Sequence, residues 1–155
     1  MMSIKVERTS LHCEASEYDY FRSIVTGGSK DALEVPFTSA GNAFVAFACL
    51  GYHHGRYEPL KEREEVTLSV YLDQDLQLPI LAALAFARLR EERPDAPVEE
   101  LTESLLSTKT IIPLVEGWAN GGLQIFKEAT AVGSPHLTVA LMDVLAEAHP
   151  GVLGA

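Results

Sequence analysis

Two adjacent glycines, Gly121 and Gly122, interrupt a run from 111 to 129 that otherwise repeats apolar residues at helical spacing. In a helix interior, two glycines cost about 1–2 kcal/mol relative to two alanines. A helix tolerates this cost where another backbone must come close or where the helix must bend. We therefore expect a long helix with a flat strip at the two glycines, and we expect Phe44 or Phe47 of an earlier apolar segment to lie across it.

Length and charge narrow the class of protein. The chain has 155 residues, which fits one domain spanning 1–155. Lys and Arg number 12 against 22 Asp and Glu, so the net charge is -10. This balance argues against broad binding to a nucleic-acid backbone, which relies on clustered Lys and Arg. A local basic patch, a partner protein with a basic face and acidic mimicry of nucleic acid all remain open.

The two cysteines, Cys13 and Cys49, are too few for a disulfide scaffold. No CxxC pair is present, so we expect no metal site, and no pattern indicates a cofactor. The longest apolar run, 78–87, is about half of the roughly 20 residues that a membrane span needs. The N-terminus lacks the apolar core of a signal peptide. We therefore expect a cytoplasmic protein that does not bind membranes.

Apolar periodicity and capping residues predict six helices. Thr38 or Ser39 is a plausible N-cap for the second helix, and Gly51 is expected to end that helix in a left-handed conformation. Asp75 is the expected N-cap of the third helix, and Gly133 is expected to end the fifth. The predicted ranges are 16–26, 39–50, 77–92, 98–107, 110–129 and 134–148, and Ser16 is the expected cap of the first.

Residues 66–72 alternate apolar and hydroxyl side chains, which predicts a strand. A lone strand cannot satisfy its backbone groups, and the best candidate for its partner is the segment 4–7. The expected fold is mainly α, a compact bundle of five or six helices with a small two-stranded β element. Residues 1–13 form an extended arm, 14–130 the core, and 134–148 a C-terminal helix.

Glu116 and Asn120 are polar residues one turn apart on the long apolar helix, so they are the candidate pair for a functional site. A catalytic carboxyl needs an apolar setting or a close like charge to shift its pKa. In an enzyme this pair would act with His53 or His54. Adjacent histidines rarely share one metal ion, and nothing near Cys13 indicates an activated thiol, so no catalytic or metal-binding residue is assigned.

The polar segment 52–65 combines aromatic, histidine and arginine side chains. This mixture suits stacking on bases, and it equally suits a protein interface. The predicted partner-binding residues are His53, His54, Arg56, Tyr57 and Arg63. Contact with DNA would need a local basic patch, which these arginines could form together with Lys61, Arg88, Arg90 and Arg93.

One block, 36–60, contains FVAFACLGYHHGRYEPL, and a second, 115–127, contains EGWANGGLQIF. In order and spacing they resemble a family of small proteins associated with DNA phosphorothioation (Dnd) gene clusters. That family has the patterns FAAxLGxxxGxRxPL and EYANGGLxIL. Here Gly117-Trp118 stands where the family has Glu-Tyr, and Cys49 replaces a small residue. The resemblance covers about residues 17 to 129 and implies an accessory role in prokaryotic DNA modification or defence, without specifying a molecular activity.

Three functions follow as hypotheses. The first is a non-enzymatic accessory protein that binds a partner protein, and DNA if the basic patch forms. The second is a small enzyme with a Glu/Asn/His site, and the third is an acidic mimic of DNA. Self-association is a further option, because the segment 40–50 is apolar on nearly all sides. Independently of function, the residues expected to determine the fold are Phe44, Phe47, Gly51, Trp118, Gly121 and Gly122.

Overall fold

The computed structural model describes residues 3–25 and 37–132. In this part of the chain the fold is mainly α with one small two-stranded antiparallel sheet, as the sequence predicts. The elements in chain order are β1 (Ser10–Glu14), a 3-10 turn η1 (Ala15–Glu17), α1 (Tyr18–Ser23), α2 (Ala40–His53), β2 (Arg63–Leu68), a 3-10 turn η2 (Ser69–Tyr71), α3 (Gln77–Glu92), α4 (Val98–Glu103) and α5 (Thr108–Val132).

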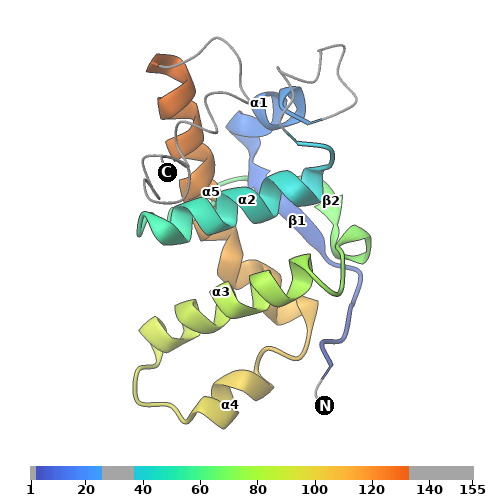
Figure 1. The fold of residues 1–155 in the computed structure, drawn as a ribbon, viewed down its shortest axis with the longest axis vertical. Helices are drawn as coiled ribbons and strands as arrows, with labels where there is room; N and C mark the ends of the chain where they lie inside the picture. Colours follow the sequence, from blue (N-terminus) through green and yellow to red (C-terminus); the bar gives the residue numbers. More distant parts are fainter. Residues whose placement is uncertain (1–2, 26–36, 133–155) are drawn as a thin grey trace, which may run out of the picture.

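The long helix α5 runs along the long axis of the molecule, and α2 and α3 cross it one above the other (Figure 1). The two-stranded β1–β2 sheet packs beside α5, and α4 lies at the end of the molecule next to α3. None of the described helices is both long and apolar enough to cross a membrane. The fold is therefore organised around α5, which contacts α2, α3 and β1.

Aromatic rings form the part of the core between α1, α2 and α5. The ring of Phe47 lies 6.0 Å from that of Phe21, 5.3 Å from Phe37 and 5.5 Å from Phe126, measured between ring centroids. Tilted and edge-on pairs at such distances add about 0.5–1.5 kcal/mol each beyond the burial of their surface. Phe44, one turn before Phe47, is also buried. Both residues therefore belong to the core.

The glycine strip receives the backbone of α2, so the expected close approach is confirmed. A Cβ at Gly122 would stand 1.8 Å from the carbonyl oxygen of Phe47. A Cβ at Gly51 of α2 would stand 1.9 Å from the carbonyl oxygen of Trp118, so each helix uses a glycine to admit the other. Gly121 faces a different neighbour, the carbonyl oxygen of Arg56 at 1.9 Å. The groups against the strip are thus backbone carbonyls, not the phenyl rings.

The predicted end of α2 is wrong. The helix continues through Gly51 to His53, and the residue with a positive φ, +65°, is Gly55. Gly51 is required for close packing inside the helix, not for a left-handed stop. The start of α2 agrees with the sequence, because the Ser39 side chain accepts a hydrogen bond from the Asn42 N–H. The apolar residues of α2 are largely buried within this one chain, which removes the specific reason given for self-association.

The strand prediction is right in kind but wrong in its pairing. The strand β2 covers Arg63–Leu68, and η2 replaces the end of the predicted strand. Its partner is β1, with Ser10 opposite Leu68 and a bulge between Leu11 and His12. The segment 4–7 instead runs beside the start of α5, where the Lys5 N–H donates to the Leu106 carbonyl oxygen at 2.7 Å.

The remaining helix boundaries agree to different degrees. The third predicted helix matches α3, but Asp75 is not its cap, because α3 follows Leu76 without a side-chain cap. In the turn before the helix, the Asp73 carboxylate accepts from the N–H groups of Asp75 and Leu76. The first helix is shorter than predicted, and Glu17 precedes α1 without a side-chain cap from Ser16. The fourth helix ends at Glu103 and α5 begins at Thr108. The predicted helix 134–148 and the break at Gly133 lie outside the described residues.

Candidate functional site

Glu116 lies on α5 against the β1–β2 sheet, and its side chain is 5% exposed. One carboxylate oxygen contacts His12 Nδ1 at 2.7 Å, and the other accepts from Arg63 Nε at 3.2 Å. His12 belongs to β1 and Arg63 opens β2, so the carboxylate joins both strands to the helix. Glu116 is thus a buried carboxylate in an apolar helix, and the histidine that it contacts is His12, not His53 or His54.

Cys13 follows His12 on β1, and burial raises the pKa of its thiol to about 12, with a further contribution from the charge of Glu64. Burial also raises the pKa of Cys49 on α2. A cysteine with a raised pKa carries little thiolate at neutral pH, and the thiolate is the nucleophile. The residue that follows His12 in the sequence is thus a buried thiol that stays protonated at neutral pH. Cys13 is therefore a core residue, and His12 joins the sheet to α5 through Glu116.

Asn120 is 8% exposed and holds the chain that leaves α2. Its Nδ2 donates to the Glu58 carbonyl oxygen at 3.0 Å, and the Glu58 N–H donates to the Gly117 carbonyl oxygen at 2.9 Å. The backbone of Glu58 is thereby fixed to α5 at two points. Within the described part of the chain, Asn120 Oδ1 has no hydrogen-bond partner. Glu116 and Asn120 thus contact different segments, and neither is joined to His53 or His54 by the contacts observed.

Tyr57 is a structural residue as well as a candidate contact. Its ring meets the Trp118 ring edge-on at 4.9 Å between centroids, and it covers Gly117, where a Cβ would stand 2.3 Å from the ring. The guanidinium carbon of Arg88 lies 3.8 Å from the centre of the same ring. Burial raises the pKa of Tyr57. The sequence did not predict the contact between Arg88 and Tyr57, because the two residues are far apart in the chain and only the tertiary fold brings α3 next to the loop after α2.

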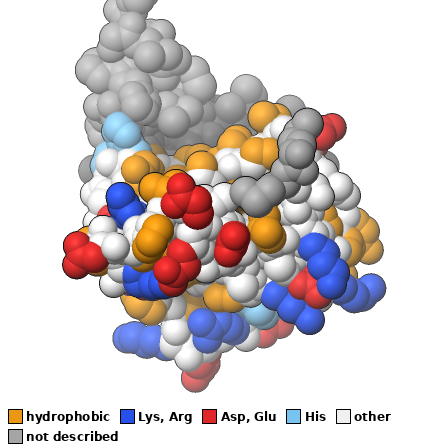
Figure 2. All heavy atoms as spheres, turned by 90° about the horizontal axis from the view of Figure 1, so that it is seen from below, with side chains coloured by type: hydrophobic (Ala, Val, Ile, Leu, Met, Phe, Trp, Pro, Cys, Tyr) orange, Lys and Arg blue, Asp and Glu red, His pale blue; other side chains and the backbone are white. Residues whose placement is uncertain are grey.

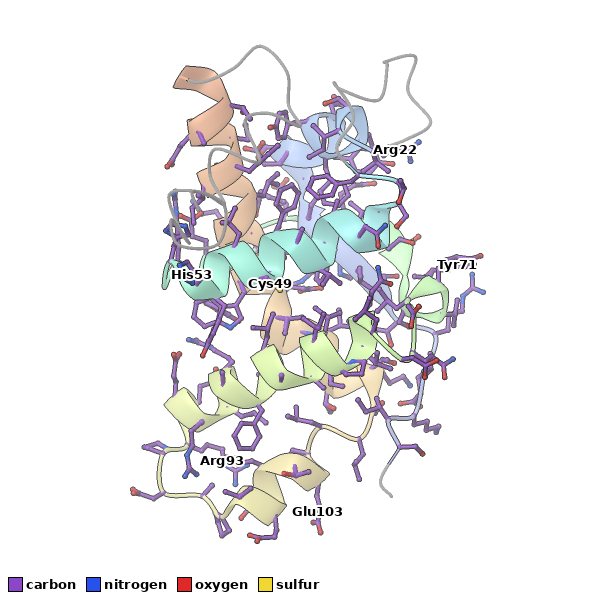
Figure 3. All side chains as sticks on the ribbon, in the orientation of Figure 1. Arg22, Cys49, His53, Tyr71, Arg93 and Glu103 are labelled. Carbon is purple, nitrogen blue, oxygen red and sulfur yellow. The ribbon has the colours of Figure 1, made fainter. Side chains whose placement is uncertain are left out.

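Among the other predicted partner-binding residues, the two arginines form ion pairs with glutamates, whereas the two histidines are exposed at the end of α2. Arg56 is bound to Glu128 and Glu58, contacts that raise its pKa, and Arg63 is bound to Glu116. His53 ends α2 and His54 follows it, and both are exposed, with ring centroids 5.3 Å apart. Figure 3 shows His53 at the end of α2, at the edge of the molecule.

Basic side chains of the described residues mostly lie beside carboxylates. Arg88 contacts Glu91 and Glu92, and Arg93 contacts Glu100. On the face seen in Figure 2, Lys and Arg side chains likewise stand next to Asp and Glu side chains. The arginines proposed for a basic patch are therefore largely neutralised by neighbours, which weakens the case for direct contact with a phosphate backbone.

A surface cavity of about 460 Å³ lies between three parts of the chain. It is lined by the end of β1 with η1, by the segment that follows Arg56, and by α5; the residues are Glu14, Ser16, Glu17, Tyr57, Glu58, Pro59, Lys61, Asn120 and Gln124. Among the residues that the structure describes, no group of three or more His, Cys, Asp or Glu is placed to hold a metal ion.

No protein-family model, curated protein or solved structure matches this chain.

Proposed function

We propose that this protein is a non-enzymatic accessory component of a prokaryotic DNA modification or defence system of the phosphorothioation type, in which it binds a partner protein. The proposal combines the two sequence blocks with one structural observation. The segment after α2 is held to α5 by backbone contacts at Gly121 and by the two hydrogen bonds of Glu58. A loop fixed in this way loses little freedom on binding, and such pre-organisation favours affinity.

Both family-like blocks meet at this loop. Gly51 and Tyr57 come from the first block, and Gly117, Trp118 and Gly121 from the second. The described contacts use these five residues for packing, which supports a role of the two blocks in maintaining the shape of this loop. At the edge of this packed unit, Tyr52 is 45% exposed while its ring meets that of Trp118 edge-on at 5.5 Å. Exposed aromatic side chains on a rigid base are frequent anchors of protein interfaces.

A protein partner is favoured over DNA by the charges. The net charge is -10, and Arg56, Arg63, Arg88 and Arg93 each face at least one glutamate. Association with a polyanion would have to break these pairs. The mimicry alternative predicts rows of carboxylates on one face, whereas the face in Figure 2 carries both signs side by side.

The direct test is reconstitution with defined proteins. The tagged chain is co-expressed with each protein of a phosphorothioation gene cluster from its own genome, and a stable complex with one of them is expected. Replacing Tyr52 and His54 with alanine is expected to weaken that complex by about tenfold or more, as for interface anchors. Tyr71→Ala is the matched control, because Tyr71 is 75% exposed and lies on the opposite side of the molecule from His53 (Figure 3).

Two results would contradict the proposal. The first is the absence of a complex with every protein of the cluster while the chain remains folded. The second is a complex that the Tyr71 control weakens as much as the Tyr52 and His54 changes do, because the surface at the end of α2 would then have no special part in binding.

A further inference from the structure

The cavity beside Asn120 has the chemistry of a binding site for a cation. Of the residues that line it, three are carboxylates, Glu14, Glu17 and Glu58, and one is an ammonium group, Lys61. Its volume of about 460 Å³ lies within the range of small-molecule pockets, about 300–1,000 Å³.

Glu17 and Glu58 are already paired, since Glu17 contacts Lys127 Nζ at 2.6 Å and Glu58 contacts Arg56. Glu14 differs. Its two carboxylate oxygens accept backbone N–H groups, from Lys61 at 2.8 Å and from Glu62 at 3.0 Å. In the described part of the chain no cationic side chain lies within ion-pair distance of it. Glu14 is therefore a carboxylate held in one orientation by neutral donors, with its full charge beside the cavity.

Asn120 supplies the second, independent feature. It is 8% exposed, and its orientation is fixed because Nδ2 donates to the Glu58 carbonyl oxygen. Its Oδ1 is a buried acceptor with no partner among the described residues. Buried polar groups are rarely left without a hydrogen bond, so this oxygen indicates a donor that the described residues do not provide. Gln124, one turn further along α5, adds a second side-chain amide to the lining.

We infer that this cavity binds the guanidinium group of an arginine side chain presented by the partner protein. A guanidinium carries five N–H donors in a planar fork, so one group can serve both a carboxylate and a neighbouring carbonyl oxygen. Tyr57 and Pro59 give the cavity apolar walls for the methylene stem of such a side chain. The site lies at the same loop that carries the proposed interface, and the inference rests on the proposed function for the identity of the ligand's carrier.

The test uses the full-length protein and N-acetyl-arginine methylamide as the probe. Titration followed by two-dimensional NMR is expected to shift the side-chain amide signals of Asn120 and Gln124. The lysine compound should bind more weakly, and the citrulline compound, which has nearly the same shape but no charge, should cause no shift. Glu14→Gln is expected to weaken binding of the arginine compound by about tenfold or more, since it removes the charge from a charge-assisted hydrogen bond.

Lys61, which also lines the cavity, provides a control whose expected effect on binding is opposite to that of Glu14. Lys61→Gln removes the one like charge and is expected to strengthen binding, whereas Lys109→Gln, on an exposed side chain at the start of α5, should leave it unchanged. Equal shifts with citrulline, equal binding of lysine, or shifts that Glu14→Gln does not affect would each overturn the inference.

The two proposals fail separately. If the partner complex forms and Glu14→Gln leaves it intact, and the arginine compound does not bind, the cavity inference is wrong while the proposed function stands. If the compound binds as described but no protein of the gene cluster forms a complex, the cavity is a guanidinium site and the proposed function is wrong.

Discussion

The carbonyl oxygen of Phe47 lies against Gly122, so close that a Cβ on that glycine would stand 1.8 Å away. At the same crossing the roles of the two helices are exchanged, because Gly51 of α2 lies against the carbonyl oxygen of Trp118 of α5. Two helices that meet backbone to backbone leave no room for side chains between them. This contact fixes the angle at which α2 crosses α5, and with it the path of the loop that follows α2.

The first prediction concerns these glycines. Gly51→Ala and Gly122→Ala each place a methyl group inside a neighbouring backbone, which can yield only if the helices separate. We expect each to lower the free energy of unfolding by about 3 kcal/mol or more, at the upper end of overpacking effects. Gly41→Ala is the matched control on α2, since its Cβ would meet only side-chain atoms, the nearest at 3.3 Å. It should change stability by less than about 1 kcal/mol, as measured by urea denaturation. A small effect at Gly51 would contradict the packing.

The sequence correctly predicted those helix ranges and caps that depend on residues close together in the chain. The range of α3 and the Ser39 cap of α2 agree with the structure, because periodicity and capping act within a few residues. The Gly121-Gly122 strip was also readable, because a helix interior rarely contains two glycines without a packing reason. The class of fold followed from these elements.

Other features depend on contacts that no local pattern records. Gly51 reads equally as a helix stop and as a packing residue, and only the position of Trp118 distinguishes the two. The choice between 4–7 and Ser10–Glu14 as the strand partner likewise depends on where the N-terminal arm meets α5. His12 and Glu116 are 104 residues apart, so their contact could not be expected from spacing.

The second prediction tests how Tyr57 is seated. Tyr57→Ala should cost about 2 kcal/mol, less than the loss of a fully buried ring because Tyr57 is only partly buried, and Tyr57→Phe should cost less than about 1 kcal/mol because the ring stays. Gly117→Ala should be destabilising in the native background, since its Cβ would stand 2.3 Å from the ring. In the Tyr57→Ala background the Gly117 change should cost less, because the ring is gone. Additive effects on the unfolding free energy would contradict this contact.

The third prediction concerns Cys13, whose pKa is raised to about 12 in the folded state, mainly by burial. The unfolded thiol titrates near pH 8.5, so the folded state binds its proton more tightly. The contribution to stability is therefore complete below pH ~8.5 and is lost as pH rises from there towards 12, by at most about 1.4 kcal/mol per pH unit. Cys13→Ala should remove this part of the alkaline loss, seen as a flatter dependence of the unfolding free energy on pH.

Thiol labelling provides an independent measurement of the same group. At pH 8, a thiol reagent should modify Cys13 far more slowly in the native protein than in urea, because the reagent requires both access and the thiolate. Cys49→Ala is the appropriate background, since it leaves Cys13 as the sole cysteine of the chain. Rapid labelling of the native protein would show that the thiol is accessible and ionised, which would contradict the burial of Cys13 in the core.

The last prediction separates a structural role of Glu116 from a catalytic one. Removing the carboxylate with Glu116→Ala leaves His12 and Arg63 without their shared acceptor. A buried ion pair broken on one side costs about 3–5 kcal/mol, but the Arg63 side chain is 54% exposed and partly screened, so about 2–3 kcal/mol is expected. In a double-mutant cycle, Arg63→Ala should cost less once Glu116 is alanine. The Glu116→Ala variant should also loosen the β1–β2 sheet from α5, seen as faster hydrogen exchange at the β1–β2 amides than at those of α3. Unchanged stability and exchange would mean that Glu116 does not hold the sheet to α5, and its buried contact with His12 would then need a functional explanation.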